Sequence, residues 1–241
     1  MKIIKRKHCI LFLLLPITFL LAWKTPQHMG DILYDMRHPN PPVKSKAEVD
    51  RILSGFKRIP SSQLPNSYLR NSGMGRSLGS RPEYFYVVER EDLHRRIVGR
   101  NRLRQVVSRD LRYRSSLFRK DRWLYVGIEP DILHKAVELQ ENLRSKGYNS
   151  DAIRITSGHR TPMHNRIVGG ARASRHQRGD ALDLHVGDVD RSGWADRRDK
   201  QIVLRILDGR IIGTRGGLGL YPGTQTVHMD LRGHRARWNS H

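Results

Sequence analysis

Two short segments in the C-terminal part of the chain combine strand-like alternation with residues that bind metals. In residues 181–186 and again in residues 227–231, apolar side chains alternate with His or Asp. Successive side chains of a β-strand point to opposite faces, so each segment predicts a strand with one apolar face and one polar face. Asp183 lies on the polar face of the first strand, and His228 and Asp230 share that of the second. Two such strands side by side would direct metal-binding groups into one cleft.

A third candidate ligand precedes the first strand. His176 lies seven residues before Asp183, with Gly179 between them, which suits a loop that folds back over the start of the strand. Catalytic zinc sites typically use three nitrogen or oxygen ligands and leave the fourth position to water. We therefore predict a zinc site formed by His176, Asp183 and His228. His185, on the same strand face as Asp183, is an alternative ligand.

The cysteine content restricts the kind of metal site. Cys9 is the only cysteine, so a closed four-thiolate site and an intrachain disulfide are both excluded. A zinc ion bound here would be of the open, water-activating kind.

Length and charge set broad limits on domain number and partners. A chain of 241 residues favours one catalytic domain with appendages. Lys and Arg number 45 against 23 Asp and Glu, a net charge of +22, which predicts attraction to polyanions. Nucleic acid, anionic lipid and acidic cell-wall polymer all fit this charge.

The N-terminus distinguishes among these partners. Basic residues between Met1 and His8 precede an uncharged, mostly apolar run from Cys9 to Trp23. This pattern predicts that residues 1–23 are a signal peptide or an uncleaved signal anchor. We favour the anchor, because the end of the run offers no clean small-x-small cleavage site. The positive-inside rule then predicts a periplasmic or extracytoplasmic protein, held at the cytoplasmic membrane by residues 9–23, with no nucleic-acid partner.

Composition divides the rest of the chain into two parts. Residues 24–81 are rich in Pro, Ser, Gly and Asn and are predicted to be a flexible linker, in which residues 49–56 could form a short helix or dock on the domain that follows. Residues 82–241 are predicted to form an α+β domain, with helices packed on a small antiparallel sheet. The arginine-rich stretch 90–122 predicts an amphipathic helix with a solvated basic face or, alternatively, a groove for a polyanion. Further strands are expected at 84–88, 124–127 and 153–156, helices at 131–146, 164–168 and 200–207, and a glycine-rich turn at 216–219.

One longer motif connects these residues to a known family. Ser174 to Asp183 reads Ser-x-His-x-x-Gly-x-Ala-x-Asp, preceded by Ser-Gly-His-Arg-Thr-Pro and Gly-Gly-Ala and followed by Gly-Leu-Gly-Leu-Tyr-Pro and His-Met-Asp. Over residues 130–238 the chain resembles the zinc D-alanyl-D-alanine peptidases, of clan MD with the hedgehog/DD-peptidase-like fold. Within that group it is most similar to YcbK-like murein endopeptidases.

The resemblance implies roles for individual residues. The positions that match His176, Asp183 and His228 bind zinc, the position that matches Arg160 steadies the developing oxyanion, and the position that matches Ser174 lies near the substrate. Elementary chemistry agrees with these roles, because zinc lowers the pKa of bound water to roughly 7 and a fixed cation stabilises a developing negative charge.

One position departs from the family pattern. Many relatives carry an acidic general base three residues before the last histidine, where this chain has Gln225. An amide cannot take up a proton, so the role would pass to another group. Asp230 is the candidate, either as the general base or as a group that orients His228.

Two functions are compatible with this sequence. The first is a zinc metallopeptidase that hydrolyses stem-peptide or cross-link bonds of peptidoglycan outside the cytoplasmic membrane. The resemblance to YcbK-like enzymes implies an endopeptidase in cell-wall remodelling, in preference to a D,D- or L,D-carboxypeptidase. The abundant arginines suit the free carboxylates of peptidoglycan peptides. The alternative is a non-catalytic, membrane-tethered protein that binds anionic cell-wall polymer through its basic surface.

Overall fold

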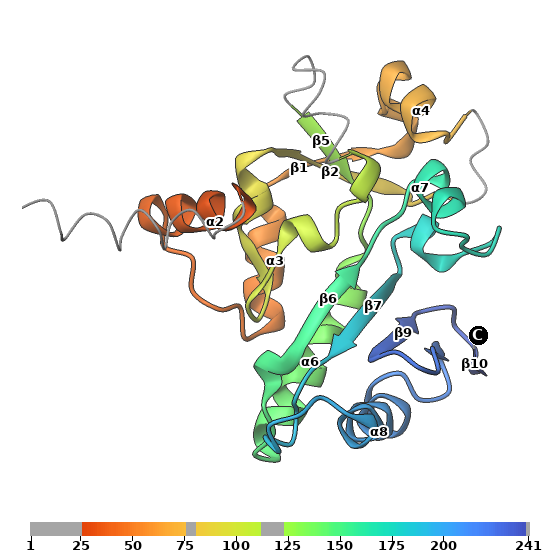
Figure 1. The fold of residues 1–241 in the computed structure, drawn as a ribbon. Coiled ribbons are helices and arrows are strands. Elements are labelled where there is room, and N and C mark those ends of the chain that lie inside the picture. The colour runs from red at the N-terminus through yellow and green to blue at the C-terminus, as the bar shows by residue number, and fades with distance from the viewer. Residues whose placement is uncertain (1–25, 76–80, 112–122, 240–241) are drawn as a thin grey trace, which may run out of the picture. The chain divides into compact units, whose positions relative to one another are not determined.

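The computed structural model describes residues 26–75, 81–111 and 123–239 (Figure 1). They belong to two compact units, divided after Asn40. The first unit contains helix α2 (Pro26–Arg37), and the second contains every other described element. The predicted membrane segment lies outside the described residues. Among the residues that are described, no helix is both long and apolar enough to cross a membrane.

A five-stranded sheet forms the centre of the second unit, in the order β10-β8-β9-β7-β6. Its strands β6 to β9 pair antiparallel, as predicted, and β10 is added at the edge parallel to β8. The strands are β6 (Ile153–Ser157), β7 (Ala181–Val186), β8 (Gly217–Leu220), β9 (Thr226–Asp230) and β10 (Ala236–Asn239).

Strand β8 occupies a segment for which we predicted a glycine-rich turn, and that prediction is wrong. Gly219 pairs with His228 in the β8–β9 register. A Cβ on Gly219 would lie 2.7 Å from the Trp238 ring. Gly219 therefore allows the Trp238 ring to approach the strand closely, and it does not reverse the chain.

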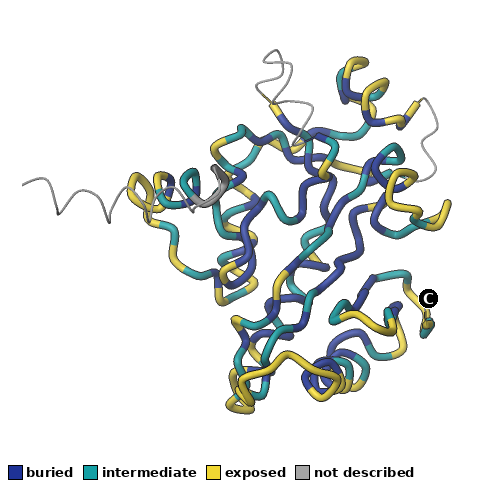
Figure 2. Tube along the Cα trace, in the orientation of Figure 1, coloured by how far each residue is buried: buried dark blue, intermediate teal, exposed yellow. Residues whose placement is uncertain are grey.

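Two helices pack with the apolar residues of the central strands. Helix α6 (Pro130–Ser145) begins with a proline at its first turn, and α8 (Arg197–Ile206) begins with a capping box formed by Asp196 and Asp199. Figure 1 shows α6 running behind β6 and β7. Leu182, Leu184 and Met229 belong with residues of both helices to one buried hydrophobic cluster. The central strands are mostly buried, whereas residues 191–198 before and at the start of α8 are exposed (Figure 2).

Much of the segment predicted to be a flexible linker is folded. It contains α3 (Lys46–Ser54), β1 (Lys57–Pro60), a 3-10 turn at Ser61–Gln63 and α4 (Asn66–Ser72). Val49 and Leu53 of α3 belong to the hydrophobic core. Pro60 and Pro65 occupy the N-cap positions of the 3-10 turn and of α4, so these prolines begin local structure here instead of preventing it. Helix α3 overlaps residues 49–56, where a short helix was one of the two expectations, whereas β1, the 3-10 turn and α4 contradict the linker prediction.

A second sheet joins this segment to the middle of the chain. Its order is β1-β2-β5, with β2 at Tyr84–Glu89 and β5 at Trp123–Val126, and both pairings are antiparallel. Ile59 of β1 lies opposite Phe85 of β2 in this register. Both side chains are buried in the core.

The arginine-rich stretch is not one helix in its described part. It forms a 3-10 turn (Glu91–His94), β3 (Arg96–Val98), β4 (Asn101–Arg102) and another 3-10 turn (Leu103–Gln105), while residues 112–122 lie outside the described residues. Gly99 has a φ of +53° between β3 and β4, and a Cβ there would lie 2.4 Å from the Gln140 amide. A backbone reversal that only glycine fits therefore replaces the predicted amphipathic helix.

Candidate active site and metal centre

Three side chains from a loop and two strands converge at one point. His176 comes from the 3-10 turn Arg175–Arg178, Asp183 from β7 and His228 from β9. His176 Nε2 lies 3.1 Å from Asp183 Oδ1 and 3.1 Å from His228 Nδ1, and His228 Nδ1 lies 3.0 Å from Asp183 Oδ1. All three residues are buried. A point about 2 Å from each of these atoms lies just outside the plane of their triangle, as zinc with two nitrogen ligands and one oxygen ligand requires.

The backbone explains why these groups meet. Asp183 and His228 are direct partners in the β7–β9 register, so their side chains lie on the same face of the sheet. Gly179, with a φ of +78°, turns the chain from His176 into β7. A Cβ on Gly179 would lie 2.0 Å from the Gly127 carbonyl oxygen, so only glycine fits this turn.

Hydrogen bonds on the outer side fix which nitrogen of each histidine faces the centre. His176 Nδ1 lies 2.7 Å from the Gly158 carbonyl oxygen. A carbonyl only accepts hydrogen bonds, so Nδ1 carries the proton and Nε2 presents its lone pair to the centre. His228 Nε2 lies 3.0 Å from Asp230 Oδ2, which in the same way leaves Nδ1 as the ligand atom.

The electrostatics also suit a cation. Burial lowers the pKa of His176, which favours the neutral ring that a metal requires. Burial alone would raise the pKa of Asp183, but the neighbouring His176 and His228 hold it well below its usual range. Burial would likewise lower the pKa of His228, and its hydrogen bonds with Asp183 and Asp230 outweigh that effect and raise it.

Arg160 is held beside the ligand set. Its guanidinium pairs with Asp183 Oδ2, and its Nε donates to Ser157 Oγ at 2.8 Å. Asp183 thus has one carboxylate oxygen toward the two histidines and the other toward Arg160. Arg160 is therefore a fixed cation beside the ligand set.

Asp230 lies behind His228 and is fully buried. Its oxygens accept hydrogen bonds from Gly217 N at 3.1 Å, from Arg232 Nη2 at 2.6 Å and from the Nε2 side of His228. Burial would raise the pKa of Asp230, but hydrogen bonds from His228 and Arg232 lower it strongly. The His228 ring separates Asp230 from the ligand point, so the geometry supports an orienting role and offers no support for the general-base role.

An open cleft of about 930 Å³ lies over the ligand set. It is lined by all three predicted zinc ligands and by Arg160 and Ser174. Among the described residues that line it, Asp183 is the only carboxylate; neither Asp230 nor Gln225 belongs to the lining. The alternative ligand His185 is also absent from the group of side chains that could share a metal ion.

Several residues for which the sequence predicted no site role also line this cleft. Tyr221, Arg232 and Trp238 form part of its wall. The Trp238 ring lies 5.2 Å from the His228 ring, and the Arg232 guanidinium lies 4.6 Å from the Trp238 ring centre. The only signal in the sequence for Tyr221 is its place in the Gly-Leu-Gly-Leu-Tyr-Pro motif.

A second cluster of carboxylates lies in the loop before α8. Asp188, Asp190 and Asp199 are close enough together to hold a metal ion. Asp199 Oδ1 accepts hydrogen bonds from the backbone of Val189 at 2.7 Å and of Asp190 at 3.0 Å. Asp188 accepts from the backbone N–H groups of the following turn. These carboxylates therefore shape the loop that leads into α8.

Comparison with known proteins places this geometry in a family. Residues 113–230 match the family model described as Peptidase M15, and this region contains all three predicted ligands. No curated protein and no solved structure gives a significant match. Peptidases of this family are zinc-dependent, and the His176, Asp183 and His228 group could bind the metal. Residues 113–230 are therefore similar to the Peptidase M15 family of zinc metallopeptidases.

Proposed function

We propose that this protein hydrolyses peptide bonds of peptidoglycan, in stem peptides or cross-links, outside the cytoplasmic membrane. The observation that carries the proposal is the convergence of His176, Asp183 and His228 at the floor of an open cleft, with Arg160 beside them. The resemblance to YcbK-like enzymes favours an endopeptidase that acts in cell-wall remodelling.

Different residues of the site would have different roles in such a reaction. When held by His176, Asp183 and His228, zinc would supply Lewis-acid polarisation of a carbonyl and activation of water. Asp230 holds His228 in the tautomer that binds metal. Arg160 presents a positive charge that needs no reorganisation, because Asp183 and Ser157 already hold it in place.

The cleft is suited to an acidic peptide. Arg160, Arg175 and Arg232 all line it. Each guanidinium is paired with a buried carboxylate, of Asp183, Asp180 and Asp230 respectively, so the three arginines are fixed. Pre-positioned guanidinium groups bind substrate carboxylates with little loss of side-chain entropy. Ser174, on the same wall, is proposed to contact the substrate.

We also propose that residues 9–23 hold the protein at the cytoplasmic membrane, with the folded unit on the outer side. This proposal is supported by the basic residues that precede the apolar run. A reporter fused after His241 that is active only outside the cytoplasm would agree with it. A reporter active in the cytoplasm would contradict it.

The activity is tested by incubating zinc-loaded protein with purified sacculi and identifying the released muropeptides by mass spectrometry. We expect release by the wild-type protein and none by His228→Ala. The matched control is His185→Ala, which removes a histidine of the same sheet that is outside the ligand group and should retain activity. Binding to sacculi without released muropeptides would support the non-catalytic tether instead.

A further inference from the structure

Tyr221 lies between β8 and β9, next to the ligand set. Gly219 of β8 pairs with His228 of β9, and Tyr221 follows two residues later, at the start of the turn that leads into β9. Its half-buried side chain lines the same cleft as Arg160 and Asp183. No hydrogen bond to the Tyr221 hydroxyl is found among the described residues. The hydroxyl is therefore free to meet a ligand in the cleft.

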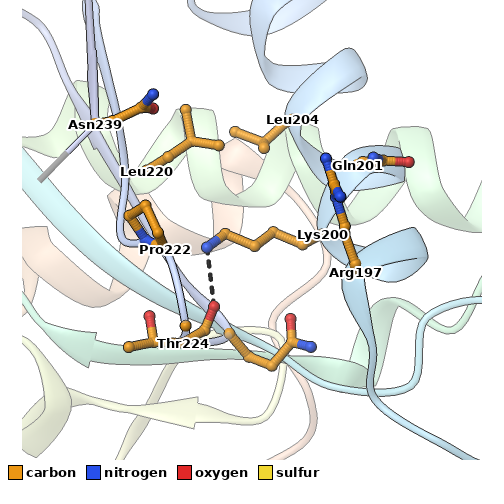
Figure 3. A pocket seen from close by; sticks show the side chains of 10 residues that line it. Arg197, Lys200, Gln201, Leu204, Leu220, Pro222, Thr224 and Asn239 are labelled. Atoms are coloured by element: carbon orange, nitrogen blue, oxygen red, sulfur yellow. Dashed lines mark hydrogen bonds between the residues drawn. The ribbon is translucent and has the colours of Figure 1, made fainter. Parts of the chain in front are cut away.

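The turn that carries Tyr221 is held in place by a buried lysine. Lys200 of α8 is 8% exposed, and its Nζ donates to the carbonyl oxygens of Tyr221 and Thr224, both at 2.9 Å. Figure 3 shows the Lys200 side chain reaching across a pocket between α8 and this turn to Thr224. The Tyr221 carbonyl also accepts from the backbone N–H of Thr224 at 3.2 Å and from its hydroxyl at 3.0 Å. Burying an ammonium group is costly unless it is hydrogen-bonded, so this arrangement fixes the turn strongly.

Two of the other donors in the cleft, Arg160 and Thr224, are already engaged. The Arg160 guanidinium is bound to Asp183 and Ser157. The Thr224 hydroxyl donates to Tyr221 O and accepts from Thr226 N at 3.1 Å. Tyr221 offers a neutral donor, since a tyrosine hydroxyl keeps its proton at neutral pH. Burial and the charge of Asp183 raise its pKa further, while Arg160 acts in the opposite direction.

We propose that Tyr221 is a catalytic residue whose hydroxyl donates a hydrogen bond to the scissile carbonyl oxygen of the peptide as that oxygen becomes negatively charged. Lys200 is the positioning residue that holds Tyr221 in place for this contact. The phenol keeps its proton throughout, so it acts beside Arg160 as a second donor to the oxyanion. This inference rests on the proposed function and adds to it a residue that stabilises the transition state.

The first experiment compares Tyr221→Phe with the wild type as zinc-loaded full chains acting on muropeptides. Loss of one oxyanion donor is expected to lower kcat by about 10² to 10³ with little change in KM. Zinc content should be unchanged, and a phosphinate dipeptide, which mimics the tetrahedral oxyanion, should lose more affinity than the substrate. Tyr148→Phe, a tyrosine outside the cleft, is the matched control and should behave as wild type. A kcat within about twofold of wild type, or a change in KM alone, would overturn the catalytic role.

The second experiment tests the positioning role by a double-mutant cycle. Lys200→Met should lower kcat by about tenfold or more in the wild-type background and by much less in the Tyr221→Phe background. Lys200→Arg, which keeps a donor, should restore part of the activity. Lys135→Met, on the surface of α6, is the control. Equal losses in the two backgrounds would show that Lys200 acts on stability and not through Tyr221.

The two proposals can fail separately. An active wild-type protein with an unaffected Tyr221→Phe variant would overturn the inference about Tyr221 alone. A zinc-loaded wild-type protein that releases no muropeptides would overturn the proposed function, and the inference about Tyr221 with it.

Discussion

His228 Nε2 and Asp230 Oδ2 lie 3.0 Å apart on one face of β9, so the ring of a predicted zinc ligand is oriented by the residue two positions later in the same strand. Asp230 is itself held by Arg232 and by the backbone of Gly217. The result is a fixed chain of contacts from Arg232 through Asp230 and His228 to the ligand point. Groups that orient a ligand in this way tune metal affinity.

Asp230→Asn should therefore lower zinc affinity by about 10- to 100-fold, because an amide holds the His228 tautomer less well than a carboxylate. Competition with a chromogenic chelator measures this affinity. Asp151→Asn, which alters an exposed ion pair with Arg100, is the control and should bind zinc as wild type does. If activity were lost while zinc affinity stayed the same, Asp230 would act as a base after all.

Zinc should stabilise the folded protein, since an unfolded chain has no assembled site. With free zinc at about 1,000 times its Kd, the expected gain in the free energy of unfolding is about 4 kcal/mol. Thermal unfolding with added zinc and with EDTA measures the shift in Tm. His228→Ala should show a much smaller zinc-dependent shift, and an equally large shift in that variant would place the stabilising metal elsewhere.

Gly179→Ala should destabilise the protein and weaken zinc binding together. The added Cβ would meet the Gly127 carbonyl oxygen at 2.0 Å, in a turn that also requires a φ of +78°. We expect a loss of about 3 kcal/mol or more, since backbone atoms must move in addition to the cost of the strained φ. Urea unfolding measures this loss.

Gly147→Ala separates the two effects. Gly147 has a φ of +79°, but a Cβ there meets nothing within 4 Å. Gly147→Ala should therefore lower the free energy of unfolding by about 1 kcal/mol, from the strained φ alone, and leave zinc affinity unchanged. Equal losses at the two positions would show that the contact with Gly127 is unimportant.

The stability of the folded unit should fall in mild acid because of His159. Burial lowers the pKa of this histidine to about 4, and neither of its ring nitrogens has a hydrogen-bond partner among the described residues. Between pH 6.5 and pH 4 the unfolded chain binds a proton that the folded chain does not. The free energy of unfolding should therefore decrease as the pH falls through this window, by about 3 kcal/mol in total.

Urea unfolding of wild type and His159→Leu at pH 4.5 and 7.5, with EDTA present, measures this contribution. The variant should lose less stability in acid than the wild type does. His234→Leu, at an exposed position, should follow the wild type. Parallel curves for wild type and His159→Leu would contradict the assignment.

The sequence alone determined the ligand set and the strands that carry it. The alternation in residues 181–186 and 227–231 is a local property, and the structure confirms both strands to within one residue at each end. When the apolar faces of both strands pack into the same core, their polar faces lie on the same side of the sheet, and Asp183 then pairs with His228. The spacing of the motif residues from Ser174 to Asp183 can likewise be read from the sequence without the structure.

Only the tertiary structure decided how the segments before this motif fold and where Asp230 and Tyr221 lie relative to the ligand set. Strand β1 is stable because Ile59 packs opposite Phe85, a partner that its own proline-rich surroundings do not indicate. Gly99 and Gly219 are set by contacts with Gln140 and Trp238, which lie far away in sequence. Local patterns encode the side-chain period of an element, whereas burial and orientation depend on residues that come together only when the chain folds.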